Sequence, residues 1–217
     1  MHELSKTSAK NGVTRLRTGS LLLVLFSIVM NVSCTTAPPV NVEDICKIFD
    51  EKRSWYKAAK KSEQRWGTPK HIQLSIIHQE SSFKFNARPP RTKLFGFIPW
   101  KRPSNAYGYA QALDSTWEWY KNDSGRRFAD RDNFDDAIDF VGWYTNMSNE
   151  SVGISKWDPY NQYLAYHEGH TGWRRKTYQQ KDWLKKAARQ VDYRSKEWNV
   201  QLQHCEDDLD EDWWMIF

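Results

Sequence analysis

The chain has 217 residues, which is the length of one or two domains. Aromatic side chains make up 15% of it, and this much ring surface available for burial excludes a disordered protein. No apolar run reaches the roughly 18 residues that a membrane-spanning helix needs. Three cysteines are too few for a disulfide-dense miniprotein.

The first 33 residues have the features of an export signal. Four basic residues and one acidic residue lie in residues 1–20, the apolar run 21–30 follows, and Ser33 stands just before Cys34. A basic segment, a short apolar segment and a small residue at the cleavage point are typical of a secretory signal peptide. The alternative, a buried core helix, is disfavoured because the run has no polar face.

The residues around Cys34 resemble the lipoprotein box of bacterial lipoproteins, although Asn31 stands where leucine is usual. The resemblance implies a lipoprotein signal peptide over 1–33, lipid on Cys34 and a tether over 34–41. Thr35 after the lipidated cysteine implies anchoring at the outer membrane, facing the periplasm. The alternative is simple cleavage to a soluble periplasmic protein.

Two further cysteines, Cys46 and Cys205, lie near the two ends of the exported domain. In an oxidising compartment we expect them to form a disulfide, which would close a loop of nearly the whole domain. Two buried free thiols are the alternative.

Charge is unevenly spread along the chain. Residues 34–204 carry 28 basic and 20 acidic residues, whereas 206–217 carry six acidic residues and no basic one. A basic body suits a polyanionic partner, and export favours cell wall or anionic lipid over nucleic acid. We expect 206–217 to be a tail, either frayed in solvent or lying across the basic loop of the domain.

Helical periodicity dominates the rest of the chain. We expect helices over about 42–66 after an Asn41 cap and before Gly67, and over 69–81, a short helix from a Ser115 capping box, and then helices from Asn133, from Asp158 to Gly169, and from about Asp182. No segment shows clear strand alternation. We therefore predict a single, mainly α domain over 42–205 with little or no β structure.

A long loop is expected over 82–106, and its stretch 84–102 contains six basic residues, four large aromatic residues and no acidic one. Such a stretch has affinity for an anionic sugar polymer, because aromatic rings stack on sugars and basic groups meet carboxylates. A solvated basic loop without a binding role is the alternative.

Glu80 is the candidate catalytic residue, because it lies four residues after Ile76 on the apolar face of the helix 69–81. Apolar surroundings raise the pKa of a carboxyl group, as a general acid requires. The alternative is a solvent-facing side chain. His167-Glu168-Gly169-His170 does not have the spacing of a zinc protease motif, so no metal or cofactor is expected.

Three segments together resemble the soluble-lytic-transglycosylase (SLT) family of the lysozyme-like superfamily. They are Glu80-Ser81-Ser82-Phe83, Ala106-Tyr107-Gly108-Tyr109-Ala110-Gln111 and Leu164-Ala165-Tyr166-His167, in the family's order. Tyr109-Ala110 stands where the family has Leu-Met, and His167 where it has asparagine. The loop between the first two segments is also about ten residues longer than usual.

The resemblance implies a lysozyme-like fold and cleavage of peptidoglycan glycan strands, with 1,6-anhydro ends and Glu80 as the single acid and base. It implies substrate contacts at Ser81, Tyr109, Gln111, Tyr166 and His167, with the Tyr166 hydroxyl orienting Glu80. A hydrolytic muramidase, with Asp114 or Glu168 holding water, and a non-catalytic wall-binding lipoprotein are the alternatives.

Overall fold

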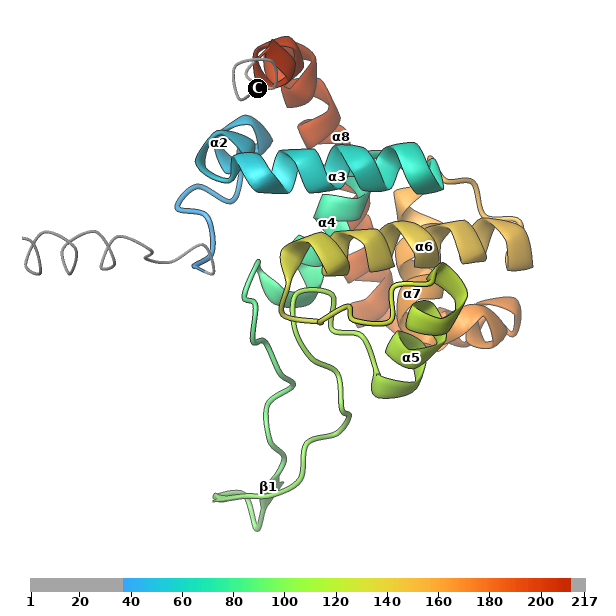
Figure 1. Ribbon diagram of the computed structural model, residues 1–217. Helices are drawn as coiled ribbons and strands as arrows, with labels where there is room; N and C mark the ends of the chain where they lie inside the picture. The colour runs from blue at the N-terminus through green and yellow to red at the C-terminus, as the bar shows by residue number, and fades with distance from the viewer. Residues whose placement is uncertain (1–36, 212–217) are drawn as a thin grey trace, which may run out of the picture. The chain divides into compact units, whose positions relative to one another are not determined.

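The computed structural model describes residues 37–211 (Figure 1). The leader, Cys34 and residues 212–217 lie outside the described residues. Seven α-helices, one short 3₁₀ helix and a two-stranded sheet make up the described part, which confirms the mainly α prediction. Within 37–211, no helix is both long and apolar enough to cross a membrane.

The N-terminal helix expected from the sequence is two helices, α2 (Ile45–Glu51) and α3 (Arg53–Trp66). The break falls at Lys52, whose backbone is not helical, and the cap is Asp44 rather than Asn41: its side chain accepts a hydrogen bond from the backbone N–H of Lys47 at 3.2 Å. α3 ends at Gly67, whose φ of 75° is the left-handed conformation that glycine adopts easily.

The remaining helices follow the predicted order. They are α4 (Lys70–Ser81), α5 (Asp114–Ser124), α6 (Phe134–Val152), α7 (Pro159–Arg174), η1 (Thr177–Gln180) and α8 (Asp182–Glu211). The Asn133 side chain caps α6 as expected. The Ser115 capping box is wrong, because the cap of α5 is Leu113, two residues earlier, and the Leu113 side chain makes no capping hydrogen bond.

α4 is the central helix of the domain. α8 packs along it, α3 and α6 pack on each other and on α4, and α7 lies against α6 and α8. Residues 70–77 of α4 are all buried, so this helix has no solvent face until its last turn. A helix enclosed on all sides holds its end in a fixed place. That end carries Glu80.

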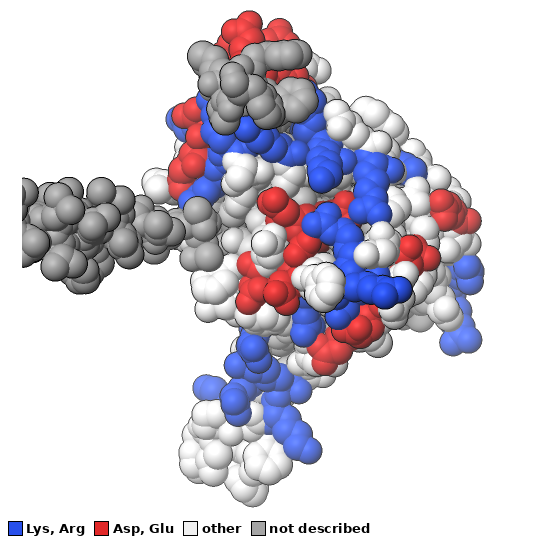
Figure 2. Space-filling model, viewed as in Figure 1, with Lys and Arg blue, Asp and Glu red and all other residues white. Residues whose placement is uncertain are grey.

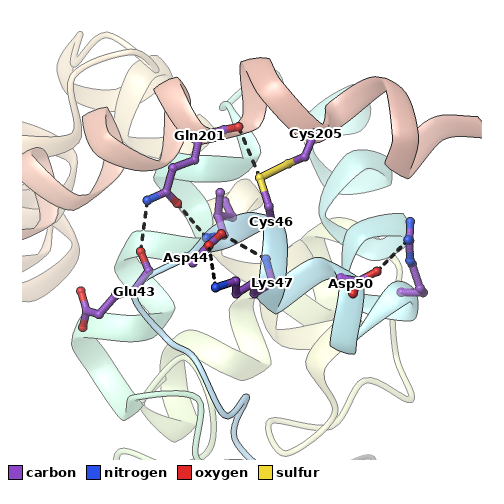
Figure 3. Close-up of a disulfide and its surroundings, with 9 residues drawn as sticks. Glu43, Asp44, Cys46, Lys47, Asp50, Gln201 and Cys205 are labelled. Carbon is purple, nitrogen blue, oxygen red and sulfur yellow. Dashed lines mark hydrogen bonds and ion pairs between the residues drawn. A yellow bond between two sulfur atoms is a disulfide. The ribbon is translucent and has the colours of Figure 1, made fainter.

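A disulfide joins Cys46 of α2 to Cys205 of α8 (Figure 3). It lies beside a second link, in which Gln201 accepts a hydrogen bond from the Ile45 N–H at 2.9 Å and donates one to the Glu43 carbonyl at 3.3 Å. The cysteines are 159 residues apart, and closing so long a loop stabilises a fold by about 4–5 kcal/mol in the chain-entropy model.

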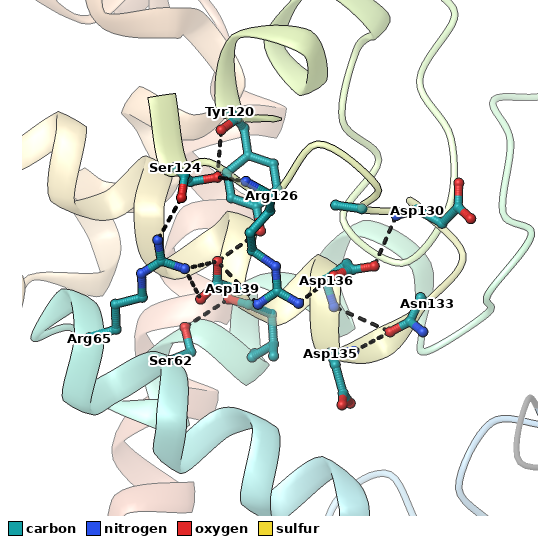
Figure 4. A network of polar contacts seen from close by, with 12 residues as sticks. Ser62, Arg65, Tyr120, Ser124, Arg126, Asp130, Asn133, Asp135, Asp136 and Asp139 are labelled. Atoms are coloured by element: carbon teal, nitrogen blue, oxygen red, sulfur yellow. Dashed lines mark hydrogen bonds and ion pairs between the residues drawn. The ribbon is translucent and has the colours of Figure 1, made fainter. Parts of the chain in front are cut away.

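A buried carboxylate, Asp139 of α6, ties three helices together (Figure 4). It accepts hydrogen bonds from Arg65 of α3 at 3.2 Å and from the Tyr120 hydroxyl of α5 at 2.8 Å. Trp66 and Arg126 also contact it. A buried charge persists only when it is paired in this way, so the network fixes α5 and α6, which form one wall of the cleft described below.

The loop expected over 82–106 contains a small hairpin that the sequence did not predict. β1 (Lys93–Leu94) pairs antiparallel with β2 (Ile98–Pro99), and the loop projects away from the helices (Figure 1). Two-residue strands are too short to show alternation. In Figure 2 basic side chains cover the arms of this loop, and its tip is uncharged.

The boundary expected before an acidic tail falls inside α8, which continues through it to Glu211. Glu206 pairs with Lys70 of α4 at 2.5 Å, and Asp210 with Lys60 of α3 at 2.6 Å. These acidic residues therefore anchor the end of α8 to the helical core and do not lie across the basic loop. Residues 212–217, the rest of the expected tail, lie outside the described residues.

Candidate active site

An open cleft of about 490 Å³ lies where the end of α4 meets α5, α6 and α7. Its lining combines aromatic rings with a small number of polar groups, as ligand clefts do. It is lined by Glu80, Pro89, Ser104, Ala106, Gln111, Ala112, Leu113, Thr116, Phe140, Tyr144, Tyr166, His167, Glu168 and Gly169. A larger hollow of about 690 Å³ between α4 and α8 is lined by Gln79 and Ser82 but not by Glu80, so we place the site in the smaller cleft.

Glu80 is partly buried in the cleft wall. Burial disfavours its charged form and raises its pKa to about 7, while a hydrogen bond with Tyr163 lowers it. At neutral pH the carboxyl group is therefore poised between its acid and base forms, which is the condition for general acid–base catalysis.

The backbone beyond Glu80 holds an unusual conformation. Ser82 and Phe83 have φ values of 49° and 62°, in the left-handed region that side chains other than glycine rarely adopt. Phe83 is fully buried, and its ring contacts those of Trp55, His78 and Trp198. This packing holds the strained turn in place. The last residue of the first motif thus fixes the helix end that carries Glu80.

The second motif forms the opposite side of the cleft. Gly108 has a φ of 78°, and a Cβ there would lie 2.0 Å from the Arg131 carbonyl oxygen, so only glycine fits. Gln111 lines the cleft and donates hydrogen bonds to the carbonyls of Ala87 at 2.8 Å and Gly108 at 2.9 Å. Gln111 therefore also holds the ends of the long loop together.

Two of the residues expected to contact substrate lie outside the cleft lining. Tyr109 is only 2% exposed and packs against Trp55 and Phe134 in the core, and it is not part of the cleft lining. The loop 106–112 has no periodicity from which the sequence could show this. Ser81 is buried outside the cleft lining, and its hydroxyl donates to the Ile77 carbonyl at 3.2 Å, as helical serines often do.

The third motif, 164–167, is hydrogen-bonded to the second motif, 106–111. The Tyr166 hydroxyl lines the cleft but donates its hydrogen bond to the Ala110 carbonyl, at 2.6 Å. The expected bond from Tyr166 to Glu80 is therefore wrong, and Tyr163 takes that role. The two tyrosines are three residues apart and share one face of α7. This spacing is the sequence signal that could have identified Tyr163.

His167 and Glu168 line the cleft at the point where α7 kinks. Gly169 leaves the helical conformation there, with φ 72° and ψ 160°. Glu168 accepts hydrogen bonds from Lys181 at 2.6 Å, from His167 at 3.1 Å and from Thr177. These donors lower the pKa of Glu168, although burial opposes them. The other muramidase candidate, Asp114, pairs with Arg131 at 2.7 Å and does not line the cleft.

The kink separates the two histidines of the discounted zinc motif. His167 contacts Trp183 edge to face, and the His170 ring nitrogen Nε2 lies 3.0 Å from the Ser148 hydroxyl. Among residues 37–211, no group of three or more histidine, cysteine, aspartate or glutamate side chains is placed to hold a metal ion.

A mainly α domain therefore carries a carboxyl of raised pKa in an open cleft, an arrangement that is suited to general acid–base chemistry. The chain matches the family model for the transglycosylase SLT domain over residues 22–205, so it belongs to that family. The match extends well beyond the three motif segments, which lie within residues 80–167. Family membership supports peptidoglycan as the substrate class and lytic transglycosylase activity in general. No curated protein and no solved structure matches the chain.

Proposed function

We propose that the protein is a lytic transglycosylase that cleaves the MurNAc–GlcNAc β-1,4 bond with Glu80 as its single acid and base. The observation that carries the proposal is a partly buried glutamate that lines the cleft, where burial raises its pKa to about 7. Most glycosidases use two carboxylates. Here the other glutamate that lines the cleft, Glu168, is engaged by Lys181, His167 and Thr177.

The reaction proceeds in two proton transfers. Protonated Glu80 gives its proton to the glycosidic oxygen as the bond from C1 of MurNAc to that oxygen breaks. The N-acetyl group of the same sugar stabilises the cationic carbon. Glu80, now a carboxylate, takes the proton of the C6 hydroxyl as O6 bonds to C1 and closes the 1,6-anhydro ring. The nucleophile is tethered to the sugar, which gives it the entropic advantage of an intramolecular reaction, and no water is consumed.

A hydrolytic muramidase is the alternative function. It needs a second carboxylate to hold water, and Glu168 lines the same cleft. Digestion of cell-wall sacculi in ¹⁸O-labelled water separates the two. We expect 1,6-anhydro ends without label. Labelled reducing ends would establish the hydrolase instead, and binding without any released fragment would establish a non-catalytic wall-binding protein.

We also propose that the protein is exported and held at the outer membrane by lipid on Cys34, facing the periplasm. The support is the sequence pattern of residues 1–35 together with the Cys46–Cys205 disulfide, which suits an oxidising compartment. The mass of the protein isolated from its cells tests the lipid directly. A mature chain that begins at Cys34 without added diacylglycerol would contradict the anchoring.

A further inference from the structure

The hairpin segment 91–101 exposes an unusual amount of apolar surface. Phe95 is 79% exposed, Phe97 72%, Trp100 49% and Ile98 42%. They follow one another within six residues, at the end of a loop that projects from the helices (Figure 1). Soluble domains rarely present apolar side chains together in this way unless the patch contacts a partner.

The turn itself is built to expose a ring. Phe95 and Gly96 have φ values of 53° and 80°, so both central residues of the turn 94–97 are left-handed, as in a type I′ hairpin turn. A bulky side chain is disfavoured in this conformation. Phe95 gains no burial in return within the domain. The ring instead stays exposed in the turn of the hairpin.

Charge is graded along the hairpin. Thr92 pairs with Lys101 and with Trp100 at the base, Lys93 pairs with Pro99, and Leu94 pairs with Ile98 nearest the turn. The basic residues Lys84, Arg88, Arg91, Lys93, Lys101 and Arg102 surround the base and arms, and residues 81–113 contain no acidic side chain. Figure 2 shows this basic surface above an uncharged tip.

We propose that the hairpin 91–101 is a membrane-docking element that inserts its apolar tip into an anionic phospholipid bilayer. At about 3.3 Å per residue, the turn extends roughly 7–10 Å beyond Lys93, which matches the roughly 5–10 Å to which interfacial segments enter a bilayer. Trp100 then lies at the headgroup level, where indole rings are favoured. The lysine and arginine side chains remain among the anionic headgroups.

The composition of the tip favours lipid over sugar. The segment 94–99 is Leu-Phe-Gly-Phe-Ile-Pro, which offers no side-chain hydrogen-bond donor or acceptor. A glycan site needs such groups for the sugar hydroxyls, whose burial without partners is costly. A bilayer interior needs none. The docking surface is independent of the acid–base chemistry proposed for Glu80.

Hydrogen–deuterium exchange on the full chain tests the proposal at the hairpin itself, whatever else holds the protein to a membrane. The full chain is mixed with vesicles of phosphatidylcholine alone or of phosphatidylcholine with phosphatidylglycerol. We expect the anionic vesicles to slow exchange of the amides of residues 93–98 about tenfold, because insertion removes them from water. Added salt should reduce the protection by screening the basic arms.

The variant F95S/F97S should lose this protection, and F128S is the matched control. Phe128 is 98% exposed outside the hairpin, so its change should leave the protection intact. Unchanged exchange at 93–98 with anionic vesicles would overturn the proposal, and equal protection by both kinds of vesicle would overturn its anionic selectivity. Protection by glycan fragments but not by vesicles would assign the hairpin to the sugar instead.

Discussion

Glu80 at the end of α4 and Glu168 at the kink of α7 line the same cleft, yet their pKa values shift in opposite directions. Burial raises the pKa of both carboxyls. At Glu168, whose side chain is only 4% exposed, Lys181 and two further donors outweigh burial. At Glu80 the neutral hydroxyl of Tyr163 does not outweigh it.

The hydrogen-bonding partners of each carboxyl group, rather than its depth of burial, therefore decide which of the two is available as an acid. A carboxylate held by a lysine stays ionised and contributes an ion pair across α7 and the chain beyond it. A carboxyl that lacks a cationic partner keeps its proton to near neutral pH.

The largest expected effect is that of Glu80→Gln on turnover. The amide keeps the shape of the carboxyl but cannot give or take the proton, so we expect activity on sacculi to fall about 10²–10⁴-fold. Binding of the variant to sacculi and its circular dichroism spectrum should match the parent and serve as controls. Residual activity above a few per cent of the parent's would contradict a single acid and base.

Glu168→Gln should have a much smaller effect on activity. It removes the charge that pairs with Lys181, so we expect less than a tenfold loss of rate and the same 1,6-anhydro ends, with a lowered melting temperature. Product analysis and thermal melting measure the two effects. A loss of rate as large as that of Glu80→Gln, with an intact fold, would assign Glu168 a direct part in the reaction.

The raised pKa of Glu80 also predicts a pH-dependent cost in stability. The folded-state pKa is about 7 against 4.5 for an ordinary glutamate, so the folded state resists ionisation, and stability is lost as pH rises from 4.5 through about 7. The glutamine variant does not titrate. We expect it to melt higher than the parent near pH 8 and at the same temperature near pH 4. Equal melting temperatures at both pH values would contradict the buried, uncharged carboxyl.

The sequence predicts the elements that depend on local pattern. The i, i+4 spacing of Ile76 and Glu80 places the carboxyl correctly, and the end of α3 at Gly67 and the cap at Asn133 follow from local chemistry. Gln111 and Tyr166 line the cleft as the motifs predict. Each of these features depends on residues a few positions apart.

Features that depend on distant residues could not be predicted from the sequence. The acidic stretch after Cys205 continues α8 because Lys60 and Lys70 meet it, and these lie about 140–150 positions earlier in the chain. Tyr109 turns inward because Trp55 and Phe134 stack on each other beside it. No spacing within the motif contains that information.

Which tyrosine bonds to Glu80, Tyr163 or Tyr166, also depends on a distant part of the chain, the loop 106–112. The loop brings the Ala110 carbonyl to the Tyr166 hydroxyl and leaves Tyr163 for the carboxyl. A change at each tyrosine should therefore have a different signature, although both sit on one face of α7.

The smallest expected effect is that of Tyr163→Phe on the pH profile of kcat/KM. The hydrogen bond from Tyr163 lowers the pKa of Glu80, so its loss should raise that pKa. Glu80 must be protonated to start the reaction, so the limb on which activity falls with rising pH should move to higher pH, by about 0.5–1 unit for one neutral hydrogen bond. Tyr166→Phe is the matched control: it should lower activity by freeing the Ala110 carbonyl but leave the limb in place. The reverse pattern, with the limb moved by Tyr166→Phe alone, would show that Tyr166 holds the carboxyl in solution.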